Sequence, residues 1–141
     1  MTIEEIQAYI LDNFENIKLS SADGNLFFMH PSNDKLPFAT ILTKDDEYDA
    51  VSNLDRDGFY RLNFCIDKEI FKSKFGHLTH KKGLESYMDV GIDFTKEDTL
   101  LPHPTYGSMN WVCVVKPSKE LFDSIKEYLE SSFETLKRNK N

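Results

Sequence analysis

The chain has 141 residues, of which 40% are hydrophobic and 29% charged, and these values are typical of one globular domain rather than of a disordered chain. Its formal charge is −7, from 24 acidic and 17 basic side chains, which disfavours nonspecific binding to phosphate backbones and to anionic membranes. No apolar run approaches the roughly 20 residues that span a bilayer, and the N-terminus lacks a signal-peptide pattern, so we expect a single cytoplasmic domain over residues 1–141 that does not bind membranes.

The N-terminal part predicts a helix followed by antiparallel strands. Thr2 and Glu5 form a capping box at the start of a segment whose apolar residues recur on one helical face. Residues 17–20 and 26–29 flank an Asp-Gly pair, which is a strong signal for a β-hairpin. Residues 38–43 predict a further strand.

An acidic stretch, residues 44–58, opens the middle of the chain. It lacks the residue order of a calcium-binding loop, so we interpret it as a solvated loop. Residues 60–66 then alternate between an apolar and a polar face, as a strand does. Asp67 is placed to cap a short helix that runs to residue 75.

The C-terminal part contains a turn, a strand and a long helix. Residues 77–100 show no clear period, and two prolines then flank His103 and restrict where its ring can point. Residues 109–115 are apolar on both faces, as expected of an inner strand. Ser118 is placed to cap the longest helix. The order predicts an α+β fold, with an antiparallel sheet flanked by an N-terminal helix, a short middle helix and a long C-terminal helix.

No recognised catalytic or metal-binding signature is present. Cys65 and Cys113 lie in apolar strands without C-x-x-C spacing, so we expect buried free thiols. A metal site made of His77, His80 and His103 lacks the compact ligand spacing of zinc sites. Phosphate-binding glycine loops and the G-x-S-x-G nucleophile motif are also missing. We therefore expect no metal and no cofactor, and a binding domain rather than an enzyme.

The candidate site joins two groups of polar residues. Arg61 and Asn63 share the polar face of one strand, and His103 and Tyr106 lie in the proline-flanked turn. A few polar groups beside apolar strands are the usual lining of a ligand site. Arg61 would supply charge and the two turn residues orientation, for a small anionic or polar ligand or for a protein partner.

Two other interpretations of Arg61 stay open. Because an unpaired buried charge is costly, Arg61 could form an internal ion pair with Asp55, Asp57 or Asp67, unless its polar sheet face is open to water. In an enzyme, His103 would act as general base and Arg61 would stabilise charge in the transition state.

Several strings resemble the MmcQ/YjbR-like proteins, a family of small bacterial proteins. They are Leu26-Phe27-Phe28, Pro37-Phe38-Ala39-Thr40-Ile41, Arg61-Leu62-Asn63-Phe64-Cys65-Ile66-Asp67, Met109-Asn110-Trp111-Val112-Cys113-Val114 and the terminal helix with residues 131–136. The resemblance implies the same α+β architecture, and DNA binding as an alternative function. The basic residues that this family tends to place before its late Trp are missing ahead of Trp111, so the chain looks more like an uncharacterised branch of that fold. We therefore do not expect nucleic acid to be the main partner.

Overall fold

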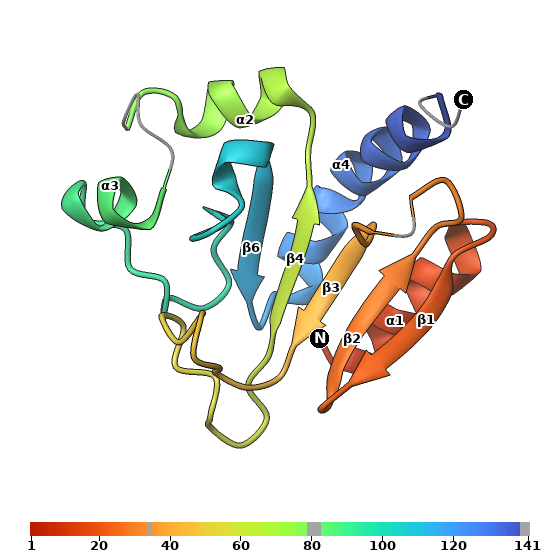
Figure 1. Cartoon of the computed structure of the whole chain (residues 1–141), viewed down its shortest axis with the longest axis horizontal. Helices are drawn as coiled ribbons and strands as arrows, with labels where there is room; N and C mark the ends of the chain where they lie inside the picture. The colour runs from red at the N-terminus through yellow and green to blue at the C-terminus, as the bar shows by residue number, and fades with distance from the viewer. Residues whose placement is uncertain (34, 79–82, 139–141) are drawn as a thin grey trace.

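A six-stranded antiparallel sheet organises the molecule (Figure 1). The computed structural model describes residues 1–33, 35–78 and 83–138. The strands lie side by side in the order β1-β2-β3-β4-β6-β5. Their bounds are Lys18–Ala22 for β1, Asn25–Met29 for β2, Ala39–Leu42 for β3, Arg61–Cys65 for β4, Leu101–Pro102 for β5 and Trp111–Val115 for β6.

The hairpin between β1 and β2 forms where the Asp-Gly pair predicts it. Asp23 and Gly24 have φ values of 54° and 84°, so both central residues of the turn are in the left-handed region. A type I′ turn needs this geometry, and its twist matches that of the flanking strands. The turn sets the register that places Leu19 opposite Phe28.

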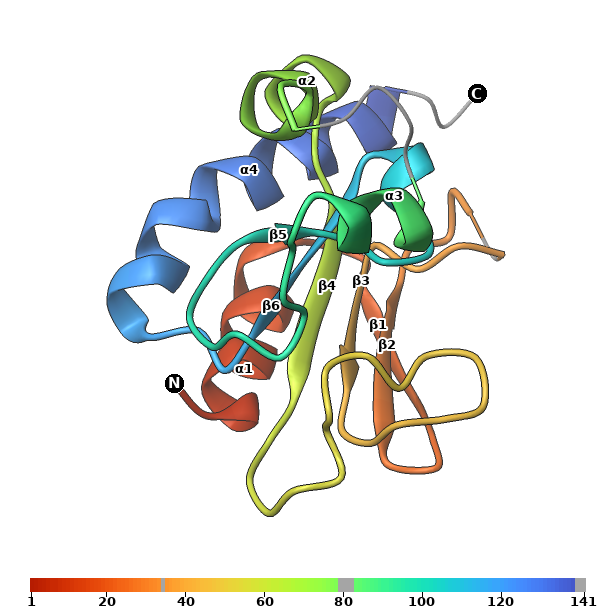
Figure 2. The same ribbon diagram turned by 90° about the vertical axis from the view of Figure 1, so that its left-hand side faces the viewer.

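Two helices cover one face of the sheet (Figure 2). These are α1, Ile3–Asn13, and α4, Lys119–Arg138. Both begin as the sequence predicts: Thr2 and Glu5 cap each other's backbone N–H, and the Ser118 hydroxyl accepts a hydrogen bond from the Leu121 N–H at 3.0 Å. Beneath them lies the main core, which includes Ile6, Ile10, Phe28, Ile41, Leu62, Phe64, Val112, Val114, Phe122, Ile125 and Leu129.

In the described parts of the chain, no long helix lies over the opposite face of the sheet. A row of paired residues crosses it from β2 to β5: Phe27, Thr40, Asn63, Cys113 and Leu101. The short helix α3, Leu84–Asp89, lies over the β5 side, and the acidic loop (residues 44–58) lies along one end (Figures 1 and 2). A small apolar cluster under α3 contains Tyr87, Phe94 and Cys113.

The α+β fold class predicted from the sequence is confirmed, and the structure departs from or adds to the expected elements at three places. Helix α2, Lys68–Phe75, begins after Asp67, but the Asp67 carboxylate accepts hydrogen bonds from Ser131 and Thr135 of α4 instead of capping α2. Residues 77–100, which show no period, include α3. The last inner strand begins at Trp111, because Met109 ends a short 3₁₀ helix, η1 (Gly107–Met109), and Asn110 is left-handed at φ 66°. None of the helices in the described parts of the chain is long and apolar enough to cross a bilayer.

Candidate functional site

Arg61 lies on the sheet face opposite α1 and α4, which we call the uncovered face because it lacks a long helix among the described residues. Loops nevertheless bury its side chain completely. Its guanidinium forms a two-pronged ion pair with Asp49, with Nη1–Oδ1 at 3.1 Å and Nη2–Oδ2 at 2.5 Å. The internal ion pair considered above therefore exists, but its acid is Asp49 of the acidic loop and not Asp55, Asp57 or Asp67. The loop folds back over the end of β4, so the charge of Arg61 is balanced inside the protein.

The remaining donors of Arg61 organise a chain of polar residues. Nε donates to Asn63 Oδ1 at 2.8 Å, and Nη1 donates to Ser52 Oγ at 2.9 Å. The Asn63 amide in turn donates to Thr40 Oγ1 at 2.9 Å, across the pairing of β3 and β4. Because each of these buried side chains has a hydrogen-bond partner, the cluster avoids the free-energy cost of burying polar groups without partners.

His103 is held by the backbone of its own turn. Its Nδ1 accepts hydrogen bonds from the N–H groups of Thr105 at 3.0 Å and Tyr106 at 2.9 Å. A neutral imidazole carries one proton, so we assign that proton to Nε2. Burial of the ring and the nearby positive charge of Arg61 lower the pKa of His103 to about 3. His103 is thus a neutral hydrogen-bond donor.

This state of His103 argues against its use as a general base. A base needs a lone pair that can reach the substrate. The lone pair on Nδ1 already accepts two backbone N–H groups, and Nε2 carries the proton. The structure therefore gives no support to the catalytic interpretation of the turn.

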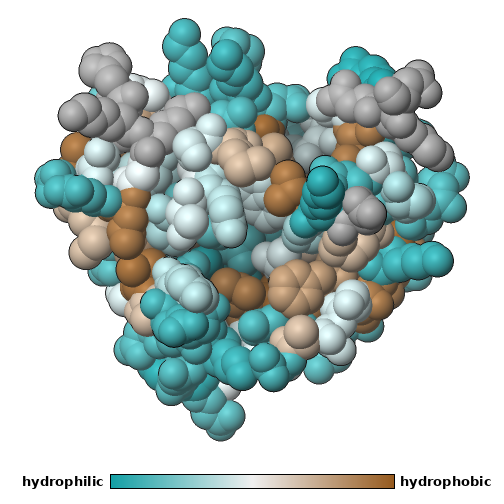
Figure 3. Space-filling view, in the orientation of Figure 1, coloured by the Kyte–Doolittle hydropathy of each residue, from teal (hydrophilic) through white to brown (hydrophobic). Residues whose placement is uncertain are grey.

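A cavity of about 670 Å³ lies on this face of the sheet. Figure 3 shows the face hollowed, with hydrophobic side chains beside a hydrophilic centre. The polar groups that line the cavity include Thr40, Asn63, His103 and Asp49. Its hydrophobic lining consists of Phe27, Met29, Leu36, Pro37, Leu42, Tyr48, Tyr106, Met109 and Trp111.

Three of the four predicted site residues line this cavity. Asn63 and His103 lie at its buried side, and Tyr106 is 49% exposed with its ring 5.0 Å from that of His103. Arg61 is not among the lining residues, although its Nη2 is 3.5 Å from His103 Nε2. The structure thus brings the two polar groups together, with Arg61 as a support below the cavity.

Sequence reasoning did not single out Thr40 or Trp111 as site residues. Thr40 alternates with apolar neighbours along β3, and that alternation is a signal for the polar face, but only the register shows that Thr40 pairs with Asn63. Trp111 pairs with Cys65 and is buried, yet it lines the cavity.

Exposed hydrophobic side chains gather at the cavity. Nine large hydrophobic residues are exposed in the described part of the chain, and four of them, Leu36, Tyr48, Tyr106 and Met109, line this one cavity. Single exposed hydrophobic residues are ordinary, whereas a group around a hollow is typical of binding sites.

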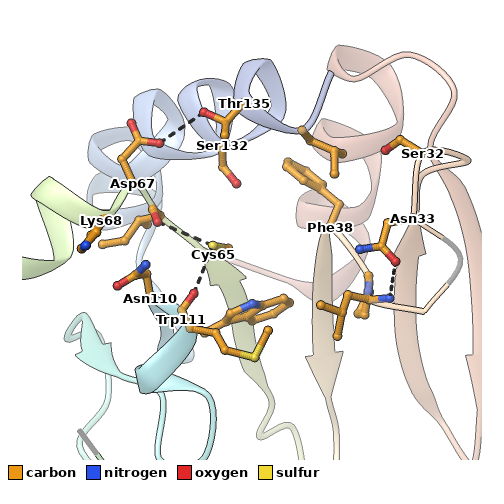
Figure 4. A pocket seen from close by; sticks show the side chains of 15 residues that line it. Ser32, Asn33, Phe38, Cys65, Asp67, Lys68, Asn110, Trp111, Ser132 and Thr135 are labelled. Atoms are coloured by element: carbon orange, nitrogen blue, oxygen red, sulfur yellow. Dashed lines mark hydrogen bonds between the residues drawn. The ribbon is translucent and has the colours of Figure 1, made fainter. Parts of the chain in front are cut away.

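A second cavity, of about 460 Å³, lies beside the first (Figure 4). The two share Leu36, Pro37, Met109 and Trp111. The half-buried Cys65 lines this second cavity. Its thiol is within hydrogen-bond distance of the backbone oxygens of Ile66 at 3.5 Å and Met109 at 3.6 Å. Burial raises the pKa of this thiol to about 11, so it has little of the thiolate that nucleophilic chemistry needs.

The two cysteines are free thiols, as the sequence predicts. Cys113 is buried, and burial raises its pKa to about 12, but Cys65 is only partly buried. Within residues 1–33, 35–78 and 83–138, no three side chains of His, Cys, Asp or Glu converge in a metal-binding group. His77 is exposed whereas His103 is buried, and His80 lies outside the described residues.

Comparison with protein families gives one match. The model of a family of unknown function, DUF6194, matches residues 1–141. No curated protein and no solved structure matches the chain. The match gives no link to the MmcQ/YjbR-like proteins, so that resemblance stays a prediction.

Proposed function

We propose that this chain, which belongs to the DUF6194 family, is a non-catalytic domain that binds a small polar molecule in the cavity beside His103. The observation that carries the proposal is the cavity itself, with a volume of about 670 Å³. Cavities of roughly 300–1,000 Å³ with mainly hydrophobic walls and a few polar groups are the usual form of small-molecule sites.

The charges around the cavity favour a polar ligand over an anionic one. Arg61, the residue expected to attract an anion, is paired with Asp49 and does not line the cavity. Asp46 and Lys35 both line it and are both exposed. An anion entering here meets no excess of positive charge to offset its lost hydration.

DNA binding, the function implied by the resemblance to MmcQ/YjbR-like proteins, has no comparable support. The basic residues near the C-terminus include Lys137, which pairs with Glu15 at 3.6 Å and with Glu134 at 3.8 Å. Counterion release from DNA needs basic side chains that are available to phosphates.

The methionines allow a direct test of cavity binding. The chain has four, of which Met29 and Met109 line the cavity while Met1 and Met88 do not. We expect a panel of small aromatic amides, alcohols, carboxylates and amines, added to protein labelled with ¹³C at the methionine methyls, to shift the signals of Met29 and Met109 selectively.

A matched pair of variants assigns the effect to the cavity. Met109→Ala removes an exposed lining residue, and Met88→Ala removes an exposed methionine from α3. We expect Met109→Ala to weaken the binding of any hit and Met88→Ala to leave it unchanged. If no compound shifts Met29 or Met109, the small-molecule proposal fails and a protein partner becomes the better hypothesis.

A further inference from the structure

The side-chain hydrogen bonds that link Arg61, Asn63 and Thr40 run from Arg61 toward the cavity. Arg61 donates to Asn63 through Nε–H, and Asn63 donates to Thr40 through its amide. The Thr40 oxygen therefore acts as an acceptor toward the protein, and its own proton remains for a further partner. Thr40 lines the cavity, so the chain of donors ends at the cavity surface.

His103 also lines the cavity and carries a second donor. Its Nε2–H faces Arg61 Nη2 at 3.5 Å, and this nitrogen is itself a donor. Two donors cannot satisfy each other, and His103 is only 4% exposed. The geometry leaves the imidazole N–H in need of an acceptor, and leaving a buried donor without one is costly.

The ion pair below the cavity determines which acceptor fits. Asp49 balances the charge of Arg61 through both carboxylate oxygens, so a ligand gains little by being negatively charged. A positively charged ligand would place its ammonium donors against the N–H of His103, which cannot accept them. An uncharged acceptor such as an amide carbonyl meets both donors without either conflict.

The aromatic residues of the cavity determine the shape of the ligand. Tyr106 and Trp111 lie with their ring centroids 6.4 Å apart, and Phe27 lines the cavity from β2. Rings of this kind bind flat molecules well, because offset and edge contacts with another ring are favourable. We infer that the cavity, if it binds small molecules as proposed above, selects an uncharged aromatic molecule whose carbonyl accepts hydrogen bonds from His103 and Thr40.

Four probes of similar size separate the elements of this inference. They are benzamide, benzoate, benzylammonium and toluene, which share a ring but differ in charge and in the acceptor. Binding is measured through the fluorescence of Trp111, the sole tryptophan of the chain, which lines the cavity. We expect benzamide to bind about tenfold more tightly than each of the others, as one or two buried hydrogen bonds would provide.

Three variants test the two donors one at a time. Thr40→Val removes the hydroxyl and Thr40→Ser retains it, so we expect weaker benzamide binding, by about five- to tenfold, in the first only. His103→Asn removes Nε2–H but retains an oxygen that can accept the N–H groups of Thr105 and Tyr106, so we expect the turn to persist and the affinity to fall by a similar factor. Circular dichroism confirms that each variant is folded.

The outcomes distinguish this inference from the proposed function. The inference is overturned if benzoate, benzylammonium or toluene binds as tightly as benzamide, or if folded Thr40→Val and His103→Asn proteins both bind benzamide as the parent does. In those cases, a selective shift of Met29 and Met109 by other compounds still supports the proposed function. If no probe affects Trp111, Met29 or Met109, both proposals fail together.

Discussion

The two faces of the sheet use the same strands for opposite purposes. On β4, Leu62 and Phe64 point toward α1 and α4, where they are completely buried in the main core. Arg61 and Asn63 alternate with them and point to the uncovered face, where they are equally buried but polar. Neighbouring residues of one strand thus stabilise the fold in two ways, one by removal of hydrophobic area from water and the other by a buried ion pair and hydrogen bonds.

This difference predicts how substitutions on each face change the stability of the protein. A hydrophobic core tolerates small losses of volume in proportion to the cavity that is left. A buried ion pair responds asymmetrically, because loss of one partner leaves an uncompensated charge inside the protein. The uncovered face should therefore be the more sensitive one, although a core of bulky hydrophobic residues lies on the other side.

The largest effect should come from the ion pair of Arg61. We expect Asp49→Asn to lower the free energy of unfolding by about 3–5 kcal/mol, because the guanidinium then lies buried without a counter-charge. Urea denaturation followed by circular dichroism measures this loss.

The same substitution elsewhere in the acidic loop is the control. Asp46 accepts hydrogen bonds from the N–H groups of Tyr48 and Asp49 through Oδ1, and an asparagine retains that oxygen. We expect Asp46→Asn to change stability by less than about 0.5 kcal/mol, as most surface substitutions do. Equal effects at the two positions would show that Asp49 matters only as a loop residue.

Much of the covered face could be predicted from the sequence. The Ser118 cap of the last helix, the Thr2–Glu5 capping box and the alternation of residues 60–66 are local patterns, and each corresponds to an element of the structure. Strand β5 could not be predicted, because its two residues form a strand only by pairing with β6. Helix α3 has six residues, too few for a clear helical period.

The uncovered face depends on contacts that no local pattern encodes. Alternation shows that Arg61 and Asn63 share a face, and the two prolines mark the His103 turn, so the candidate residues could be found. The partner of Arg61 could not, because the acidic loop and its surroundings offer several carboxylates and only the folded loop selects Asp49. Whether Arg61 reaches the cavity depends on the same loop.

The second largest effect should be a loss of stability in acid that depends on His103. Its pKa falls from an ordinary 6.5 to about 3 in the folded protein. Between pH 6.5 and about pH 3, the His103 side chain is protonated in the unfolded chain but neutral in the folded protein. The free energy of unfolding therefore decreases as the pH is lowered through this range. At pH 5 the loss due to His103 is about 2 kcal/mol.

Denaturation at pH 7 and pH 5 measures this loss, and a non-titrating variant isolates it. We expect His103→Asn to reduce the difference in the free energy of unfolding between the two pH values by about 2 kcal/mol. An unaltered pH dependence in His103→Asn would mean that His103 is not held neutral in the folded protein.

The smallest expected effect on stability comes from replacing one tyrosine by phenylalanine on each face of the sheet. Tyr60, on the covered face, donates its hydroxyl proton to the Met1 carbonyl at 2.7 Å. Tyr87, under α3 on the other face, has a buried hydroxyl without a hydrogen-bond partner in the described structure. Removal of a satisfied hydroxyl costs about 1 kcal/mol, whereas removal of an unsatisfied one is neutral or stabilising.

We therefore expect Tyr60→Phe to lower the free energy of unfolding by about 1 kcal/mol and Tyr87→Phe to leave it unchanged or raise it. Gly107 sharpens the test, because a Cβ at this position would lie 2.3 Å from the Tyr87 hydroxyl oxygen. Gly107→Ala should then be less harmful in the Tyr87→Phe background, a coupling that a double-mutant cycle measures. Additive effects would show that the side chain of Tyr87 moves away freely, and that the apolar cluster under α3 is packed more loosely than the core beneath α1 and α4.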